Sequence, residues 1–270
     1  MKHYRWIAVL CLLPAWNGSA IALNGFGTFG VQSRVEKAVA MWRERCKSSG
    51  EFIHRKATGV EGIMLLKLRP PMNPWDQYLL SDPYGKDLDG EGYIQTFLRG
   101  AYRANNTDIP EGGPRRLAYK WVDAVDPKDG VLYRYTGGIE EPWIRDKNFL
   151  KGYQRFEMRR TPALGLQPVA RYGVTFDDIS TPEERDYWIA GSILRVVDIT
   201  TGEIMAERIG YMLDVQQGSK ARGRQPWTYA ADNACPRFDR NLAKPMQSYL
   251  YQAQPYQTLD FVEKVLRPLE

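Results

Sequence analysis

The clearest helical pattern in the chain lies near its N-terminus, over residues 31–47. Its apolar positions recur at the three- and four-residue spacing of one helix face, and its charged residues fall mostly elsewhere. Gly50 follows, where it is placed to end the helix. The apolar face comprises Val31, Val35, Ala38, Val39, Trp42 and Cys46. The pattern therefore predicts an amphipathic helix that carries Cys46 in its last turn.

Beyond Gly50 the pattern changes to short runs of β-branched and aromatic residues separated by turn residues. Residues 187–199 and 203–215 meet at a turn that ends in Gly202, which predicts a long hairpin. Residues 119–125 and 131–135 flank a strong turn sequence that runs from Asp126 to Gly130. Residues 52–56 and 63–68 are a third candidate pair, joined near Gly59, and residues 153–159 and 169–176 add two more strands.

Two further helices are predicted in the C-terminal half of the chain. Thr181 suits an N-cap, Pro182 the first helical position, and Glu184 the third position after the cap. A short helix therefore begins there. Residues 259–266 cluster Phe261 and Val265 with their apolar neighbours on one side of a second helix.

These elements predict an α+β fold. Strands joined by tight turns pair antiparallel, and the helices lie mainly toward the ends of the chain. We expect a curved antiparallel β-sheet built from hairpins, with the N-terminal amphipathic helix and the C-terminal helix packed on one face. Strands and helices do not alternate regularly, which argues against a parallel nucleotide-binding sheet.

The first residues have the pattern of a secretory signal peptide. Lys2 and Arg5 precede an apolar run over residues 6–16, and a small-x-small cleavage site ends at Ala22. The run is too short to span a bilayer, which needs about 20 apolar residues. We expect a periplasmic or secreted protein with a signal peptide over residues 1–22, a single domain over residues 23–270, and no membrane span in the mature chain.

Export changes the interpretation of the cysteines. Cys11 lies inside the apolar run, which leaves Cys46 and Cys235 in the mature chain. One pair in an oxidising compartment predicts one disulfide. The alternative is a reactive thiol at Cys46, since Arg45 and Lys47 flank it and nearby cations lower a thiol pKa.

Charge excludes one class of partner. The formal net charge is +5, and it falls to +3 when Lys2 and Arg5 are removed with the leader. A nucleic-acid-binding protein concentrates Lys and Arg in a stripe, which this chain does not do. We expect no nucleic-acid partner.

The most specific chemical motif is acidic. Residues 87–94 resemble the first eight positions of an EF-hand calcium loop, with Asp87, Asp89 and Glu91 as side-chain ligands and the carbonyl of Tyr93 as a fourth. Position twelve is Leu98, where the loop needs a bidentate Glu. The alternative is a solvated acidic turn. Calcium is the only cofactor that the motifs suggest.

Signals for catalysis are sparse. His54 is the only histidine outside the leader, and no nucleophile motif accompanies it. Glu141 stands beside Pro142 and Trp143, which would give a glycan-cleaving carboxylate an aromatic platform. A hydrolase would need a second carboxylate across a cleft, and the sequence does not place one.

A basic, glycine-containing loop precedes Trp227 and carries Arg222 and Arg224. Together these three residues form a candidate ligand-binding site for an acidic partner, and the alternative is a solvated loop. We expect an exported, non-enzymatic binding protein whose ligand, in the envelope or on another protein, is unknown. The alternative function is a carboxylate-dependent hydrolase of the cell envelope, assisted by calcium.

Overall fold

The chain has an α+β fold in a computed structural model that describes residues 26–70, 82–85, 90–99, 118–239 and 254–269. The signal-peptide prediction lies outside these residues. The helices are α1 (Phe26–Cys46), α2 (Gly90–Leu98), α3 (Pro182–Asp186), α4 (Pro226–Ala230) and α5 (Gln257–Val265). None of the described helices is both long enough and apolar enough to cross a bilayer.

The strands are β1 (Gly50–Ile53), β2 (Ala57–Val60), β3 (Gly62–Leu65), β4 (Trp121–Val125), β5 (Leu132–Glu140), β6 (Arg155–Pro162), β7 (Tyr172–Asp178), β8 (Ile189–Asp198), β9 (Glu203–Leu213), β10 (Ala234–Cys235) and β11 (Leu266–Pro268). Nine of them form one sheet in the order β1-β9-β8-β7-β3-β4-β5-β6, with β10 on β9. β11 and β2 pair separately.

The large sheet is mixed, so the expectation of a purely antiparallel sheet is wrong. β3 pairs in parallel with both β4 and β7. Parallel neighbours need a long crossover connection, and residues 66–120, which include α2, connect β3 to β4. Hairpin signals cannot reveal such a pairing because the two strands are far apart in the sequence.

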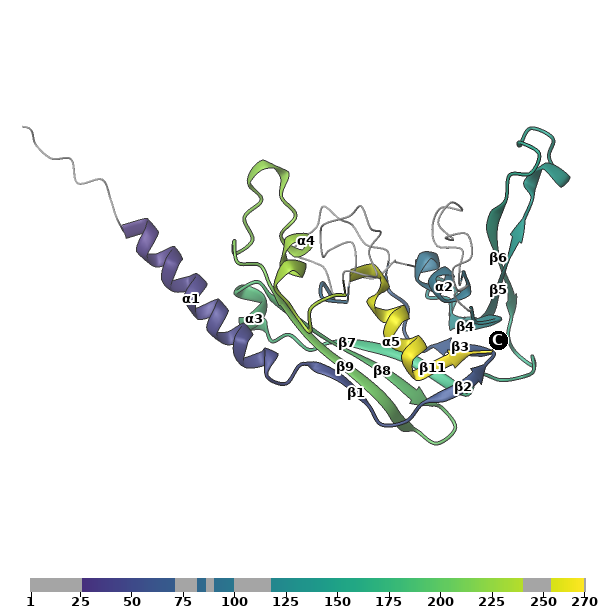
Figure 1. Cartoon of the computed structure of the whole chain (residues 1–270), viewed down its shortest axis with the longest axis horizontal. Helices are drawn as coiled ribbons and strands as arrows, with labels where there is room; N and C mark the ends of the chain where they lie inside the picture. The colour runs from purple at the N-terminus through teal and green to yellow at the C-terminus, as the bar shows by residue number, and fades with distance from the viewer. Residues whose placement is uncertain (1–25, 71–81, 86–89, 100–117, 240–253, 270) are drawn as a thin grey trace, which may run out of the picture.

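Two predicted hairpins are confirmed. β4 and β5 pair antiparallel across the turn at residues 126–130, and β8 and β9 pair antiparallel over ten positions. Gly130 and Gly202 both have positive φ, at 72° and 75°, which explains why glycine ends each turn. β5 and β6 form a further long hairpin that projects from the rest of the fold (Figure 1).

The predicted hairpin near Gly59 is wrong. β1 pairs with β9, β2 pairs with β11, and β3 enters the middle of the large sheet. Each short apolar run does form a strand, but its partner comes from a distant part of the chain. Gly59 has φ +68° within β2 and does not form a hairpin turn.

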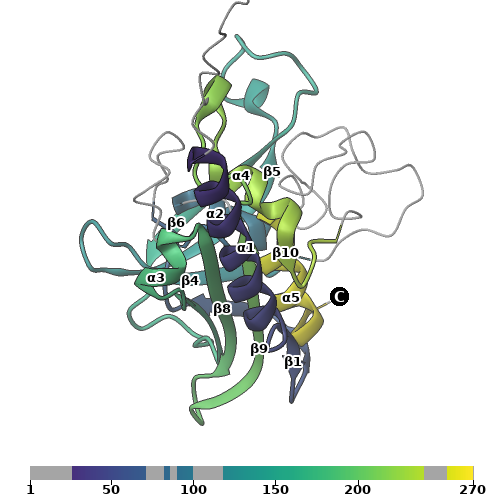
Figure 2. The ribbon, with the colours of Figure 1, turned by 90° about the vertical axis from the view of Figure 1, so that its left-hand side faces the viewer.

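The two faces of the β8–β9 hairpin contact different helices. Ile189, Tyr211 and Leu213 form a cluster with Ala38 of α1, and Figure 2 shows α1 crossing this hairpin. Leu194 and Ala206, on the opposite face by strand alternation, join the main core with residues of α2 and α5. The expectation that the N-terminal and C-terminal helices pack on one face of the sheet is therefore wrong, because α1 and α5 lie on opposite faces of this hairpin.

The predicted start of α3 and the predicted disulfide are both confirmed. The Thr181 hydroxyl accepts from the Glu184 N–H, and the Glu184 carboxylate accepts from the Thr181 N–H, which completes a capping box. Cys46 and Cys235 form a disulfide with Cα atoms 5.6 Å apart. It connects the end of α1 to β10.

Candidate functional site

A cleft of about 420 Å³ lies between the first turn of α2 and the base of the β5–β6 hairpin. Its volume falls in the range of about 300 to 1,000 Å³ that is usual for small-molecule sites. Its lining combines aliphatic side chains with charges of both signs. The lining residues are Leu68, Arg69, Gly90, Glu91, Gly92, Ile94, Asp126, Pro127, Lys128, Tyr135 and Arg160.

The turn after β4 forms one wall of the cleft. The Asp126 carboxylate accepts from the Lys128 N–H at 2.9 Å and pairs with Arg160 of β6. The Lys128 N–H and then Arg160 lower the pKa of Asp126 below its ordinary value, so the group stays ionised. Hydrogen bonds to Tyr135 and then to Asp126 raise the pKa of Arg160. These contacts hold the turn after β4 in place, and they pair the charges of Asp126 and Arg160 with each other.

The start of α2 also lines the cleft. Gly90 has φ +48°, which suits glycine, and its N–H donates to the Arg69 carbonyl at 3.0 Å. Glu91 occupies the first turn of α2, where the helix dipole favours a carboxylate. Ile94 is buried and supplies an apolar surface on the same helix.

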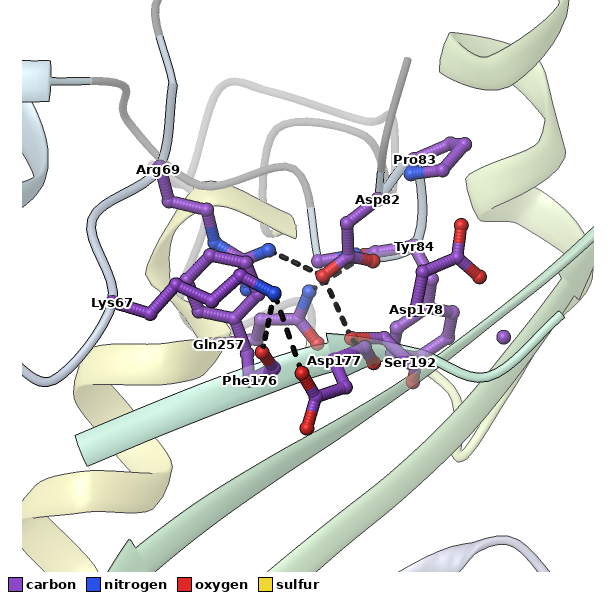
Figure 3. A network of polar contacts seen from close by, with 12 residues as sticks. Lys67, Arg69, Asp82, Pro83, Tyr84, Phe176, Asp177, Asp178, Ser192 and Gln257 are labelled. Atoms are coloured by element: carbon purple, nitrogen blue, oxygen red, sulfur yellow. Dashed lines mark hydrogen bonds and ion pairs between the residues drawn. The ribbon is translucent and has the colours of Figure 1, made fainter. Parts of the chain in front are cut away.

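Arg69 connects the cleft to a buried polar network, drawn in Figure 3. Its guanidinium pairs with Asp82, and both side chains are almost fully buried. The Asp82 carboxylate also accepts from the Ser192 hydroxyl at 2.9 Å. The guanidinium lies 3.4 Å from the centroid of the Phe176 ring, a cation–π contact. Because a buried ion pair is costly to break, Arg69 is held in one position.

Residues 82–85 are fixed from the other side by two glutamines. Gln254 donates to the Pro83 and Tyr84 carbonyls at 2.8 and 2.9 Å, and Gln257 donates to the Tyr84 carbonyl at 2.9 Å. Burial raises the pKa of the Tyr84 phenol, while Arg208 opposes that shift. The network therefore anchors a short segment against β8 and β9 and supports the wall that carries Arg69.

Two charged side chains that line the cleft are not held in ion pairs with other described residues. Among the residues that the structure describes, the Lys128 ammonium and the Glu91 carboxylate enter no ion pair. Both side chains line the cleft, together with Leu68, Ile94 and Pro127. The cleft thus offers one cation, one anion and an apolar surface to a ligand.

The predicted calcium ligands are only partly described. Asp87 and Asp89 lie outside the described residues, whereas Glu91 and Tyr93 lie in α2. Residues 90–94 are therefore helical. Tyr93 is buried, with its ring 5.5 Å from that of Phe97. No group of three or more His, Cys, Asp or Glu side chains among the described residues could hold a metal ion. Calcium binding stays a prediction.

The basic loop has two different environments. Arg222 is exposed and has φ +58°. Arg224 pairs with the buried Asp214, with oxygen distances of 2.5 and 2.9 Å. Trp227 is buried against Trp188, with ring centroids 4.9 Å apart. Of the three predicted ligand-binding residues, only Arg222 presents its side chain openly to solvent.

The remaining candidates lie apart from the cleft. Glu141 is at the far end of the β5–β6 hairpin, where its carboxylate accepts from the Gly152 N–H at 2.7 Å. His54 is exposed beside β1. Cys46 is in the disulfide, so it is not a free thiol.

Comparison of the chain with protein families, with curated proteins and with solved structures finds no match. The candidate site therefore depends on its own geometry. Sequence reasoning had singled out Glu91 but missed Arg69, Lys128 and Arg160 as neighbours of it. The turn signal at residues 126–130 located Lys128 on a surface loop, and no local signal connects that loop to α2.

Proposed function

We propose that the protein is an exported, non-enzymatic binding protein that takes a small amphipathic zwitterion, such as a short peptide with free termini, into the cleft. The observation that carries the proposal is that Lys128 and Glu91, which enter no ion pair among the described residues, line one cleft together with aliphatic side chains. A peptide carboxylate would lie near Lys128, its ammonium near Glu91, and an aliphatic side chain against Leu68 and Ile94.

The support for export comes from the leader pattern and from the cysteines. Residues 1–22 have the charge, apolar run and small residues of a cleaved signal, and a disulfide persists in an oxidising compartment. We propose a periplasmic or secreted location, with one domain over residues 23–270.

The test is thermal unfolding in the presence of leucyl-leucine, because a ligand of the folded state raises the unfolding midpoint. We expect leucyl-leucine to raise the midpoint and the same dipeptide with blocked termini to leave it unchanged. Lys128→Gln and Glu91→Gln should each abolish the rise. Arg222→Gln is the matched control, since its exposed cation lies on the basic loop.

Two results would sink the proposal. If free and blocked dipeptides act alike, the charges of the cleft do not select the ligand. If Arg222→Gln abolishes the rise and Lys128→Gln does not, the basic loop is the binding site.

A carboxylate-dependent hydrolase is the second candidate, because Glu91 and Asp126 line the same cleft. Asp126 is held ionised by the Lys128 N–H and Arg160, so Glu91 would have to serve as the proton donor. The carboxylates of Asp87, Asp89 and Glu91 would hold the calcium ion. Turnover of a cell-wall glycan that needs Ca²⁺ and is lost in Glu91→Gln would favour this candidate over binding alone.

A further inference from the structure

The β5–β6 hairpin ends in an unusual tip, residues 141–154, which we call the hairpin tip. In Figure 1 the hairpin projects from the end of the sheet that lies away from α1. The tip begins with a short 3₁₀ helix, Pro142–Ile144, and its backbone returns through a series of turns. The projection leaves the tip free to reach a surface.

The hairpin tip exposes large apolar side chains to solvent. Leu150 is 80% exposed and Ile144 is 68% exposed, and Phe149 and Tyr153 are also exposed. Burying these side chains would be favourable through the hydrophobic effect, but the projecting hairpin leaves them exposed to water. Large exposed apolar side chains that gather on one segment commonly mark an interaction site.

The tip is internally ordered. The Phe149 and Tyr153 rings stack with an interplanar angle of 4°, and the Lys147 ammonium lies 3.5 Å from the centroid of the Trp143 ring. Lys147 also donates to the Trp143 carbonyl at 2.9 Å. These contacts hold the apolar side chains in place before any partner arrives, which lowers the entropic cost of binding.

The charged side chains of the hairpin tip carry a small positive excess. The tip holds three cations, Arg145, Lys147 and Lys151, and two carboxylates, Glu141 and Asp146. Arg145 pairs with Glu140 of β5 at 3.0 Å. The Asp146 carboxylate accepts from the Asn148 N–H at 3.0 Å, and that of Glu141 accepts from the Gly152 N–H. The two acids are thus used inside the tip. Among the described residues the Lys151 ammonium enters no ion pair, and it lies 5.2 Å from the centroid of the Trp143 ring.

We propose that the hairpin tip docks on the surface of a membrane that contains anionic lipid. Ile144 and Leu150 would enter the acyl boundary, the aromatic rings would lie at the headgroup level, and the cations would meet the lipid charges. A protein partner is less well matched, because a stable protein interface uses about 20 to 30 residues on each side and the tip is smaller.

The first test measures binding of the full chain to vesicles of phosphatidylcholine with and without phosphatidylglycerol. Leu150→Ser should weaken binding by about tenfold or more, the effect of withdrawing one leucine from the acyl region. Lys151→Gln should weaken binding to the anionic vesicles by about fivefold and leave binding to neutral vesicles unchanged. Leu164→Ser is the matched control, since Leu164 is 95% exposed but lies outside the tip. Lys56→Gln, at an exposed lysine beside β1, controls for charge.

A second measurement makes the result independent of any binding by the leader. An environment-sensitive fluorophore is attached at Leu150→Cys or at Leu164→Cys, in a Cys11→Ser background. With anionic vesicles, the label at position 150 should shift to the blue and lose quenching by iodide, and the label at position 164 should not.

Three results would overturn the proposal. One is the absence of vesicle binding, and another is a label at position 150 that stays as open to iodide on vesicle-bound protein as the label at position 164. The third is a blue shift at position 150 that needs no vesicles and grows with protein concentration, which would make the tip an interface between copies of the chain.

Discussion

Removal of the Cys46–Cys235 disulfide should destabilise the protein by an amount that its loop length sets. The cysteines are 189 residues apart in sequence. In the chain-entropy description, closing a loop of that length in the unfolded chain contributes about 5 kcal/mol at 25 °C. This is a large share of the total stability of a domain, which is about 5 to 15 kcal/mol.

The folded state should survive the change, because other contacts hold α1. Ala38 is fully buried in a cluster with Ile189 and Leu213, and Lys37 pairs with Glu183 at 3.1 Å. The loss of stability therefore comes mainly from the unfolded chain, which gains conformational entropy when the cross-link is removed. The denaturant dependence of the unfolding free energy should also steepen, since the unbridged unfolded chain exposes more surface.

The assay is urea unfolding, monitored by tryptophan fluorescence, of Cys46→Ser/Cys235→Ser and its parent, both in a Cys11→Ser background. With a slope of about 2 to 3 kcal/mol per M for urea, the midpoint should fall by about 2 M. A thiol-free reductant should bring the parent to the midpoint of the variant and leave the variant unchanged. Midpoints of variant and parent within about 0.3 M of each other would refute the loop-entropy reasoning.

Two further substitutions test the packing of β8 and β9. Asp198 is fully buried, and hydrogen bonds from Arg171 and then Arg55 lower its pKa from the ordinary 3.8 to about 2. Its stabilising effect is therefore complete above about pH 4 and is lost as the pH falls through 2. At neutral pH, Asp198→Asn should have a lower unfolding midpoint than the parent protein. Between pH 4 and pH 2 its midpoint should change less with pH than that of the parent. A Cβ at Gly210 would lie 2.0 Å from the Tyr84 ring, so Gly210→Val should cost about 1 to 3 kcal/mol in urea unfolding, or more if the fold cannot relax. An unchanged midpoint would show that Tyr84 moves freely.

The candidate site could be predicted only in fragments. Glu91 stood out because it belongs to an acidic motif, and residues 126–130 stood out as a turn. Arg69 gave no signal, because a single arginine before two prolines has no preferred environment in sequence alone. What joins them is the crossover from β3 through α2 to β4, which carries the start of α2 over the base of the next hairpin.

The basic loop shows that residue type alone does not determine the environment of a side chain. Arg224 and Trp227 have the composition of a binding surface, yet Arg224 neutralises the buried Asp214 and Trp227 packs on Trp188. An aromatic or cationic side chain serves a core or a surface equally well, and only its neighbours in space decide between them.

The sequence by itself determined the features that depend on neighbouring residues. The β4–β5 and β8–β9 hairpins follow from turn chemistry, the start of α3 follows from its capping box, and the disulfide follows from two cysteines in a chain for which we propose export. The tertiary structure alone decided that β3 lies between β7 and β4, that α1 and α5 contact opposite faces of the sheet, and that Lys128 and Glu91 line one cleft. Turns and caps are stabilised by contacts within a few residues, whereas strand order and clefts are selected by burial over the whole chain, which no local pattern records.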